Sequence, residues 1–136
     1  MNRRLLTVLA LSISLFFTQS MFAQEQTINN DEKPVVLFAE FEFESKDMGL
    51  AIELLTEMQN QTYENEEGCM MYDLLLSSEK PNTVYIYECY ENNAAVKLHN
   101  NASYFKNIVG NKLPSLIKSQ KILTLSPIND MGVAIE

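Results

Sequence analysis

The fold is decided by residues 66–105, which read EEGCMMYDLLLSSEKPNTVYIYECYENNAAVKLHNNASYF. Two runs in this stretch, Cys69–Ser77 and Thr83–Tyr90, are rich in apolar and aromatic residues. Between them lie about five residues that include the turn formers Pro81 and Asn82. The pattern predicts a β-hairpin with a short connection.

A helix is predicted directly after this hairpin. Small and apolar residues recur there at three- and four-residue spacing, at Ala94, Ala95, Leu98, Ala102 and Phe105. Asn92 or Asn93 can serve as the N-cap. The only histidine of the chain, His99, lies on this helix.

The flanking segments complete the order of elements. Val35–Glu44 alternates in the manner of a strand, and Met48–Met58 follows the helical period, with Ser45 as the expected N-cap. A further helical turn is expected at Leu113–Leu116, and Gln120–Ile128 is the last predicted strand. The order strand, helix, strand, strand, helix, strand predicts an α+β fold of the ferredoxin-like split βαβ type. It has one antiparallel sheet with both helices on one face.

Apolar side chains are expected on both faces of this sheet. The second face would carry Phe38, Tyr85, Tyr87 and Leu125. Because both helices cover the same face, the other face should be buried against a further layer. The simplest cover is the sheet of a second copy, so we expect a homodimer.

The first residues have the pattern of a secretory signal peptide. Arg3 and Arg4 precede an apolar run at Leu5–Phe17, and the small residue Ala23 follows it closely. An uncleaved anchor is the alternative, but the apolar run is shorter than the roughly 20 residues that span a bilayer. We therefore expect a signal peptide at 1–23, a flexible leader at 24–34, one domain at 35–128 and a tail at 129–136. The mature protein would be exported, periplasmic or secreted, with no stable membrane anchor.

Charge and composition exclude several classes of partner. Cleavage after Ala23 would leave eight basic and eighteen acidic residues, a net charge of −10. Bulk charge therefore disfavours binding to nucleic acid. The four glycines are scattered, so a Gly-rich loop for a nucleotide cofactor is not indicated. No His, Cys and acid spacing typical of a tightly bound metal is present.

Cys69 and Cys89 lie on the two strands of the predicted hairpin. A turn centred near Glu79 or Lys80 would place them on one sheet face, directly opposite or diagonal to each other. A cross-strand disulfide is therefore one alternative. Two buried free thiols are the other, and we favour them because disulfide geometry is strict.

The central stretch resembles the antibiotic biosynthesis monooxygenase (ABM) domains, which include small quinol monooxygenases. The resemblance covers roughly Val35–Ile128 and rests on three motifs: Glu67-Gly68-Cys69-x-x-Tyr72, Tyr87-Glu88-x-Tyr90-Glu91, and His99 followed by Ser103-Tyr104-Phe105. Glu67 stands where the family commonly has proline, and Tyr90 stands where it commonly has tryptophan. The resemblance implies a dimeric α+β barrel formed sheet against sheet.

His99 is the candidate catalytic residue. An imidazole titrates near neutrality, which suits proton transfer or ligation of a metal or haem. The alternative is a surface histidine beside Asn100 and Asn101, but the resemblance favours the functional interpretation. Haem-degrading relatives add an asparagine on the first strand and a tryptophan on the third. Val35–Glu44 has no asparagine and the chain has no tryptophan, so haem cleavage is disfavoured.

Four aromatic residues are candidates for substrate binding: Tyr72, Tyr90, Tyr104 and Phe105. Phenol rings can stack on a flat substrate and hydrogen-bond its oxygens. The alternative for each tyrosine is a half-buried residue with a solvated hydroxyl. Carboxylates such as Glu88 and Glu91 could do acid–base work, although exposure on one face of a strand explains them equally well.

The resulting hypothesis is a small monooxygenase that needs neither flavin nor metal and oxidises a quinol or polycyclic phenol with dioxygen. His99 would be the base or would orient the substrate oxygen. The alternative is a non-catalytic dimeric barrel that binds a hydrophobic small molecule in the cell envelope, since one fold hosts many functions. The position of the imidazole relative to a cavity distinguishes the two.

Overall fold

The computed structural model describes residues 32–128. The predicted signal peptide, most of the leader and the C-terminal tail at 129–136 lie outside the described residues.

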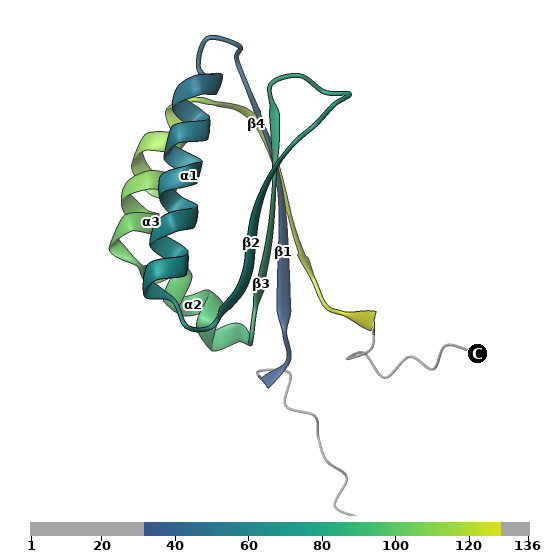
Figure 1. Cartoon of the computed structure of the whole chain (residues 1–136), viewed down its shortest axis with the longest axis vertical. Coiled ribbons are helices and arrows are strands. Elements are labelled where there is room, and N and C mark those ends of the chain that lie inside the picture. The colour runs from purple at the N-terminus through teal and green to yellow at the C-terminus, as the bar shows by residue number, and fades with distance from the viewer. Residues whose placement is uncertain (1–31, 129–136) are drawn as a thin grey trace, which may run out of the picture.

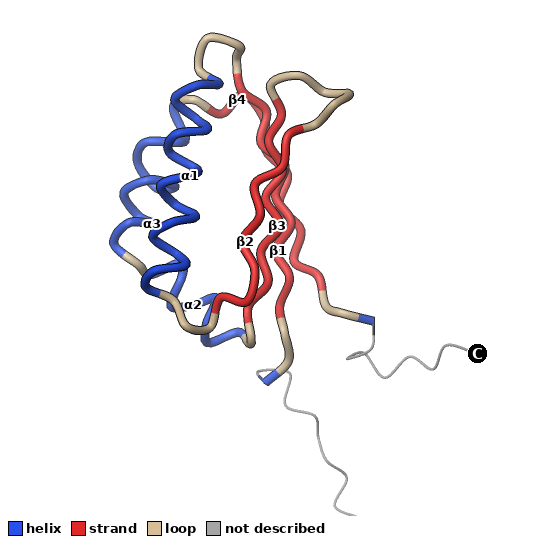
Figure 2. Tube along the Cα trace, viewed as in Figure 1, coloured by secondary structure: helices blue, strands red, loops and turns tan. Residues whose placement is uncertain are grey.

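The chain folds as an α+β sandwich of one sheet and one helical layer, which confirms the ferredoxin-like prediction. Its elements are β1 (Val35–Phe43), α1 (Met48–Asn65), β2 (Cys69–Leu76), β3 (Thr83–Tyr90), α2 (Asn93–Asn101), α3 (Ser103–Asn107), a π turn (Ile108–Lys112), a 3-10 turn (Leu113–Ser115) and β4 (Ile117–Leu125). The strands are antiparallel in the order β2-β3-β1-β4. All the helices lie on one face of the sheet (Figures 1 and 2).

The core lies between that face and the helices. The alternation of β1 directs Ala39, Phe41 and Phe43 towards α1. These side chains pack against an apolar stripe of α1 that includes Leu55 and Met58. Each fully buried side chain of this size stabilises the fold by about 1.5–3 kcal/mol. This packing fixes α1, and so also fixes the turn that follows it.

Two helix ends differ from the prediction. The N-cap of α1 is Asp47, not Ser45, and Asp47 makes no side-chain capping bond. Ser45 instead accepts a hydrogen bond from the Asn82 side chain of the β2–β3 connection. Asn92 does cap α2, by accepting from the backbone N–H of Ala95.

The second predicted helix is broken at one residue. Ala102 has an extended conformation, with φ −58° and ψ 142°, and separates α2 from α3. The last strand also begins earlier than predicted, at Ile117, and ends at Leu125. The break turns α3 relative to α2, so Tyr104 and Phe105 need not continue the face of α2.

A β-bulge separates the two cysteines. The β2–β3 register shifts between Cys69 and Met71, so Cys69 pairs with Tyr90 and Cys89 pairs with Met71. Both thiols are free. Burial raises the pKa of the Cys69 thiol to about 11, so it is an unreactive thiol at neutral pH.

Gly68 allows the α1–β2 turn to lie against α2. A Cβ built at Gly68 would come within 2.6 Å of the Ala95 Cβ, which is attached rigidly to the helix. We expect Gly68→Ala to lower the free energy of unfolding by about 1–3 kcal/mol, because the turn and α2 must separate. Chemical denaturation measures this difference.

Gly49 provides the matched control. It lies in the first turn of α1, and an added Cβ would have no neighbour within 4 Å. Gly49→Ala should leave stability unchanged or raise it by up to about 1 kcal/mol, because alanine is the better helix former. Equal losses in the two variants would refute the close contact between Gly68 and Ala95.

In the part of the chain that the structure describes, nothing covers the face of the sheet away from the helices (Figure 1). Phe38 stacks on Tyr85 there, with ring centroids 5.6 Å apart. Met71, Leu75, Leu123 and Leu125 are exposed beside them. Within residues 32–128, no helix has the length and apolar character needed to cross a membrane.

Candidate active site

His99 is buried between two glutamates. It lies on the sheet-facing side of α2 and is only 1% exposed. Its Nδ1 is 3.0 and 3.1 Å from the two carboxylate oxygens of Glu66. Its Nε2 is 3.6 Å from Oε2 of Glu88, beyond hydrogen-bond distance. The two carboxyl groups therefore lie at opposite nitrogens of one ring.

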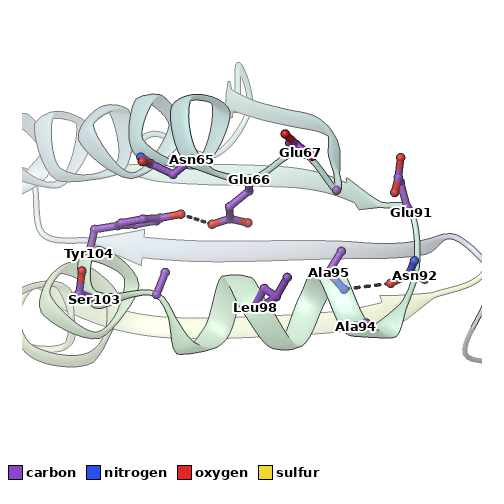
Figure 3. A pocket seen from close by; sticks show the side chains of 12 residues that line it. Asn65, Glu66, Glu67, Glu91, Asn92, Ala94, Ala95, Leu98, Ser103 and Tyr104 are labelled. Carbon is purple, nitrogen blue, oxygen red and sulfur yellow. Dashed lines mark hydrogen bonds between the residues drawn. The ribbon is translucent and has the colours of Figure 1, made fainter.

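Glu66 is held by the turn between α1 and β2. Its backbone N–H bonds to the carbonyl of Thr62, and its carbonyl accepts from Cys69. The hydroxyl of Tyr104 donates to the same carboxylate that contacts His99, and Figure 3 shows these two side chains pointing towards each other. Glu66 therefore connects the α1–β2 turn to the consecutive helices α2 and α3, more than thirty residues later in the sequence.

Glu88 comes from the inward face of β3. Its strand directs Val84, Ile86, Glu88 and Tyr90 towards the helices, and all four are buried. The Tyr90 hydroxyl donates to Oε2 of Glu88 at 2.7 Å. Burial raises the pKa of the Glu88 carboxyl from its ordinary 4.5 to about 7, against the opposing effect of the Tyr90 hydrogen bond.

The surroundings keep the imidazole neutral. Burial lowers the pKa of His99, and the neighbouring Glu66 carboxylate only partly opposes this effect. A carboxylate can only accept hydrogen bonds, so we assign the single ring hydrogen to Nδ1, facing Glu66. The lone pair of Nε2 is then available on the Glu88 side.

Three aromatic rings surround the imidazole. The ring of Phe105 meets it edge-on, with centroids 4.9 Å apart and an interplanar angle of 68°. The rings of Tyr90 and Tyr72 lie 5.1 and 6.1 Å away. These contacts restrict rotation of the imidazole and exclude water from it.

A cavity of about 390 Å³ is lined by His99 and by Glu88, the carboxyl nearest to Nε2. Its walls come from all four strands and from the helical layer, and they include Val35, Leu37, Ala39, Tyr72, Ile86, Glu88, Val96, His99, Phe105, Val109 and Ile122. Ile122 faces the cavity from β4 yet is 56% exposed. Among residues 32–128, β4 pairs only with β1 and forms an edge of the sheet, so the cavity opens along β4.

A second hollow of about 770 Å³ lies on the Nδ1 side (Figure 3). It is a groove between the α1–β2 turn and α2, and its walls include Glu66, Glu67, Glu91, Leu98 and Tyr104. Glu66 lines this groove, whereas Glu88 lines the cavity. His99 lines the cavity together with Glu88, and its Nδ1 contacts the glutamate that lines the groove.

The structure brings the predicted site residues together around His99, with different placements. Tyr72 and Phe105 line the cavity together with His99. Tyr90 is fully buried with its hydroxyl on Glu88, and Tyr104 lines the groove with its hydroxyl on Glu66.

Glu66 was not among the predicted site residues, and Glu88 was considered for acid–base work with exposure on a strand face as an equal alternative. The inward register of Glu88 with Val84 and Ile86 is a signal that the sequence contains. Glu66 has no comparable local signal, because its role depends on a contact across thirty-three residues.

A metal ion would need ligands that converge on one point. Over residues 32–128, no group of three or more His, Cys, Asp or Glu side chains is arranged in that way. Glu66 and Glu88 instead point to different nitrogens of His99. The arrangement is suited to moving protons through the imidazole.

Comparison with known proteins identifies the family of this chain. Residues 34–111 match the sequence profile of the family described as antibiotic biosynthesis monooxygenase. The search of curated proteins gives no significant match.

Solved structures share the fold. A conserved protein of unknown function and possible oxidoreductase from Bacteroides thetaiotaomicron is 23% identical, with a TM-score of 0.66 over 71% of this chain and 99% of that chain. A candidate antibiotic biosynthesis monooxygenase from Caulobacter crescentus is 19% identical, with a TM-score of 0.67 over 73% of this chain and 93% of that chain. The protein Rv0793 from Mycobacterium tuberculosis is 24% identical, with a TM-score of 0.65 over 71% of this chain and 95% of that chain.

Proposed function

Since the chain belongs to the antibiotic biosynthesis monooxygenase family, we propose that it oxidises a quinol or polycyclic phenol with dioxygen. The observation that carries the proposal is a buried imidazole at the wall of an apolar cavity, with Nδ1 held by the Glu66 carboxylate and Nε2 3.6 Å from Glu88, which lines the same cavity.

The proposed reaction converts a quinol and dioxygen to a hydroxyquinone and water. One oxygen atom enters the ring carbon and the other leaves as water, so the substrate itself supplies the electrons. Removing the phenolic proton gives an anion that can pass an electron to dioxygen. The protein then has to supply a base and a dry site.

His99 is the proposed base. The substrate hydroxyl would place its proton on Nε2, and the imidazolium that forms would lie against the Glu66 carboxylate. Glu66 therefore fixes the tautomer of the resting ring and stabilises the charge that develops on it. Tyr104 holds Glu66 in place through its hydroxyl.

The cavity fits a flat aromatic molecule. Its volume of about 390 Å³ lies within the usual range for small-molecule sites, which is about 300–1,000 Å³. Tyr72 and Phe105 are the proposed aromatic walls, and aliphatic side chains such as Leu37, Ile86 and Val109 supply the rest. Such a lining favours an apolar ring system over a charged or strongly hydrated substrate.

A non-catalytic binding protein would also need an apolar cavity, but it would not need a basic nitrogen there. His99 lines the cavity together with Tyr72 and is positioned from the other side by Glu66. Burying a histidine and two glutamates opposes folding unless their mutual contacts compensate. This arrangement favours the catalytic alternative.

Oxygen consumption tests the proposal. The purified protein should increase the rate of oxygen uptake with at least one member of a panel of benzoquinols, naphthoquinols and anthrone-type phenols. It should do so in buffer that contains a metal chelator, with the hydroxylated product identified by mass spectrometry. Rates equal to the background oxidation of every compound in the panel would contradict the proposed function.

We also propose that the working form is a homodimer in which two sheets stack face to face. The uncovered face described above carries stacked aromatic rings and four exposed apolar residues. Packed sheets lie about 10 Å apart and bury such side chains between them.

A further inference from the structure

We propose that Glu88 is a second catalytic residue, the acid that protonates the departing oxygen when the oxygenated substrate loses water. This inference rests on the proposed function and assigns a separate group to its last step.

Glu88 has access to the same reacting atoms as His99. Its carboxyl lines the cavity, and its Oε2 is 3.6 Å from Nε2 of His99. A substrate oxygen seated between these two groups would be near both. Glu66 does not have this access, because its carboxylate lines the groove and is engaged by Nδ1 of His99 and by Tyr104.

The surroundings of Glu88 favour a carboxylic acid over a carboxylate. The residue is 8% exposed, and the described contacts of its carboxyl are the Tyr90 hydroxyl and the neutral imidazole. The paired residue on β1 is Leu37, and β4 places Thr124 at the same level. Among residues 32–128, five titratable groups face Glu88. They are Tyr90 on the same strand, Tyr72 and Cys69 on β2, Glu66 in the α1–β2 turn and His99 on α2.

Loss of water from the oxygenated substrate requires two proton movements in opposite directions. The hydroperoxide has an H–C–O–O–H unit. The His99 imidazolium first gives the phenolic proton to the peroxide oxygen, which completes the hydroperoxide and leaves Nε2 unprotonated. Nε2 then takes the proton from carbon, and the electron pair of that C–H bond becomes the second bond of the new carbonyl. The O–O bond breaks, and its electron pair leaves with the outer hydroxyl, which takes the Glu88 proton and departs as water.

The cycle closes within the site. The step leaves an imidazolium and a Glu88 carboxylate, whose nearest atoms are 3.6 Å apart in the resting structure. Transfer of the proton from Nε2 to Glu88, directly or through the product water, restores both groups. A single residue cannot be base and acid at the same moment, so the second group has a chemical reason to be present.

Glu88→Gln is the test. Glutamine keeps the size of the side chain and still accepts from Tyr90, but it has no acidic proton to give. The rate of product formation should fall about 100-fold or more, the usual contribution of general acid catalysis. In single turnovers, quenched samples should contain a species 32 mass units heavier than the substrate, because oxygen adds but water is not lost.

The pH dependence of the reaction rate distinguishes an acid from a residue that only supports the fold. If Glu88 had a purely structural role, replacing it would not change the shape of this dependence. The wild-type rate should fall as pH rises through about 7, where Glu88 loses its proton, and this decline should be absent in Glu88→Gln. Glu91→Gln is the matched control, because Glu91 follows the same strand but is exposed and lines the groove. It should keep both the wild-type rate and the wild-type decline.

Thermal unfolding tests the protonation state without any substrate. Between pH 4.5 and about 7 the folded protein keeps the Glu88 proton, whereas the unfolded chain has lost it. At Glu88 the folded state therefore binds more protons, so the contribution of this group to stability falls as pH rises through this window. Relative to wild type, Glu88→Gln should become more stable as pH rises from 4.5 to 7.5, and Glu91→Gln should not.

The outcomes separate the two claims. Wild-type activity that survives unchanged in Glu88→Gln, with the same pH profile, would overturn the role of Glu88 and leave the proposed function intact. If wild type and Glu88→Gln differed in stability by the same amount at every pH from 4.5 to 7.5, Glu88 would not be protonated in the folded protein. Absence of wild-type oxygen uptake with the whole panel would contradict the proposed function, and the role of Glu88 would fall with it.

Discussion

Replacing His99 by alanine is expected to lower the rate of oxygen uptake by about 100- to 10,000-fold, the contribution typical of general base catalysis. The variant removes the Nε2 that would take the phenolic proton. It also leaves the Glu66 carboxylate without its imidazole partner. The proposed substrate would then bind mainly in its protonated form, which reacts slowly with dioxygen. Initial rates measured against substrate concentration should show the loss in kcat.

A second variant separates chemistry from folding. His99→Gln keeps an amide that can donate to Glu66 but has no basic nitrogen. It should be as inactive as His99→Ala while its thermal unfolding stays closer to wild type. If either variant retained wild-type rates at full substrate saturation, His99 would have no part in the reaction.

Placing two acidic residues on the uncovered sheet face should convert the dimer to a monomer. Leu123 and Leu125 are 38% and 45% exposed on β4, and their side chains share the face that carries Phe38. The double change Leu123→Glu and Leu125→Glu would bury like charges against each other across the proposed interface. Sedimentation velocity at micromolar concentration should show a wild-type dimer and a variant monomer.

The control for this experiment lies on the opposite side of the molecule. Leu50 is 50% exposed on α1, and Leu50→Glu adds a similar charge where no interface is proposed. It should remain dimeric, and circular dichroism should show that all three proteins are folded. A stable wild-type monomer at the same concentration would refute the proposed dimer.

The order of elements was predictable because it depends on local pattern. Alternation along β1 and the three- and four-residue spacing in α1 and α2 predicted the ferredoxin-like arrangement correctly. The errors arose where one residue changes the geometry. The extended backbone of Ala102 splits the second helix, and the bulge after Cys69 shifts the hairpin register. Neither position carries a proline or glycine that would indicate the change.

The site was predictable in part for the same reason. His99 is identifiable by residue type, and Tyr72 and Phe105 by their motifs, and the three surround one cavity. Glu66 and Glu88 were undervalued because acidic residues are usually exposed. Only the packing of the α1–β2 turn against α2 shows that both carboxyl groups flank the imidazole.

Oxygen-isotope labelling tests the central claim most directly. The protein would be mixed with its best quinol under ¹⁸O₂ in ordinary water, and the product analysed by mass spectrometry against His99→Ala. The account predicts one ¹⁸O atom in each product molecule, formed at the wild-type rate and not by the variant. Product without ¹⁸O, or equal labelling by the variant, would contradict it.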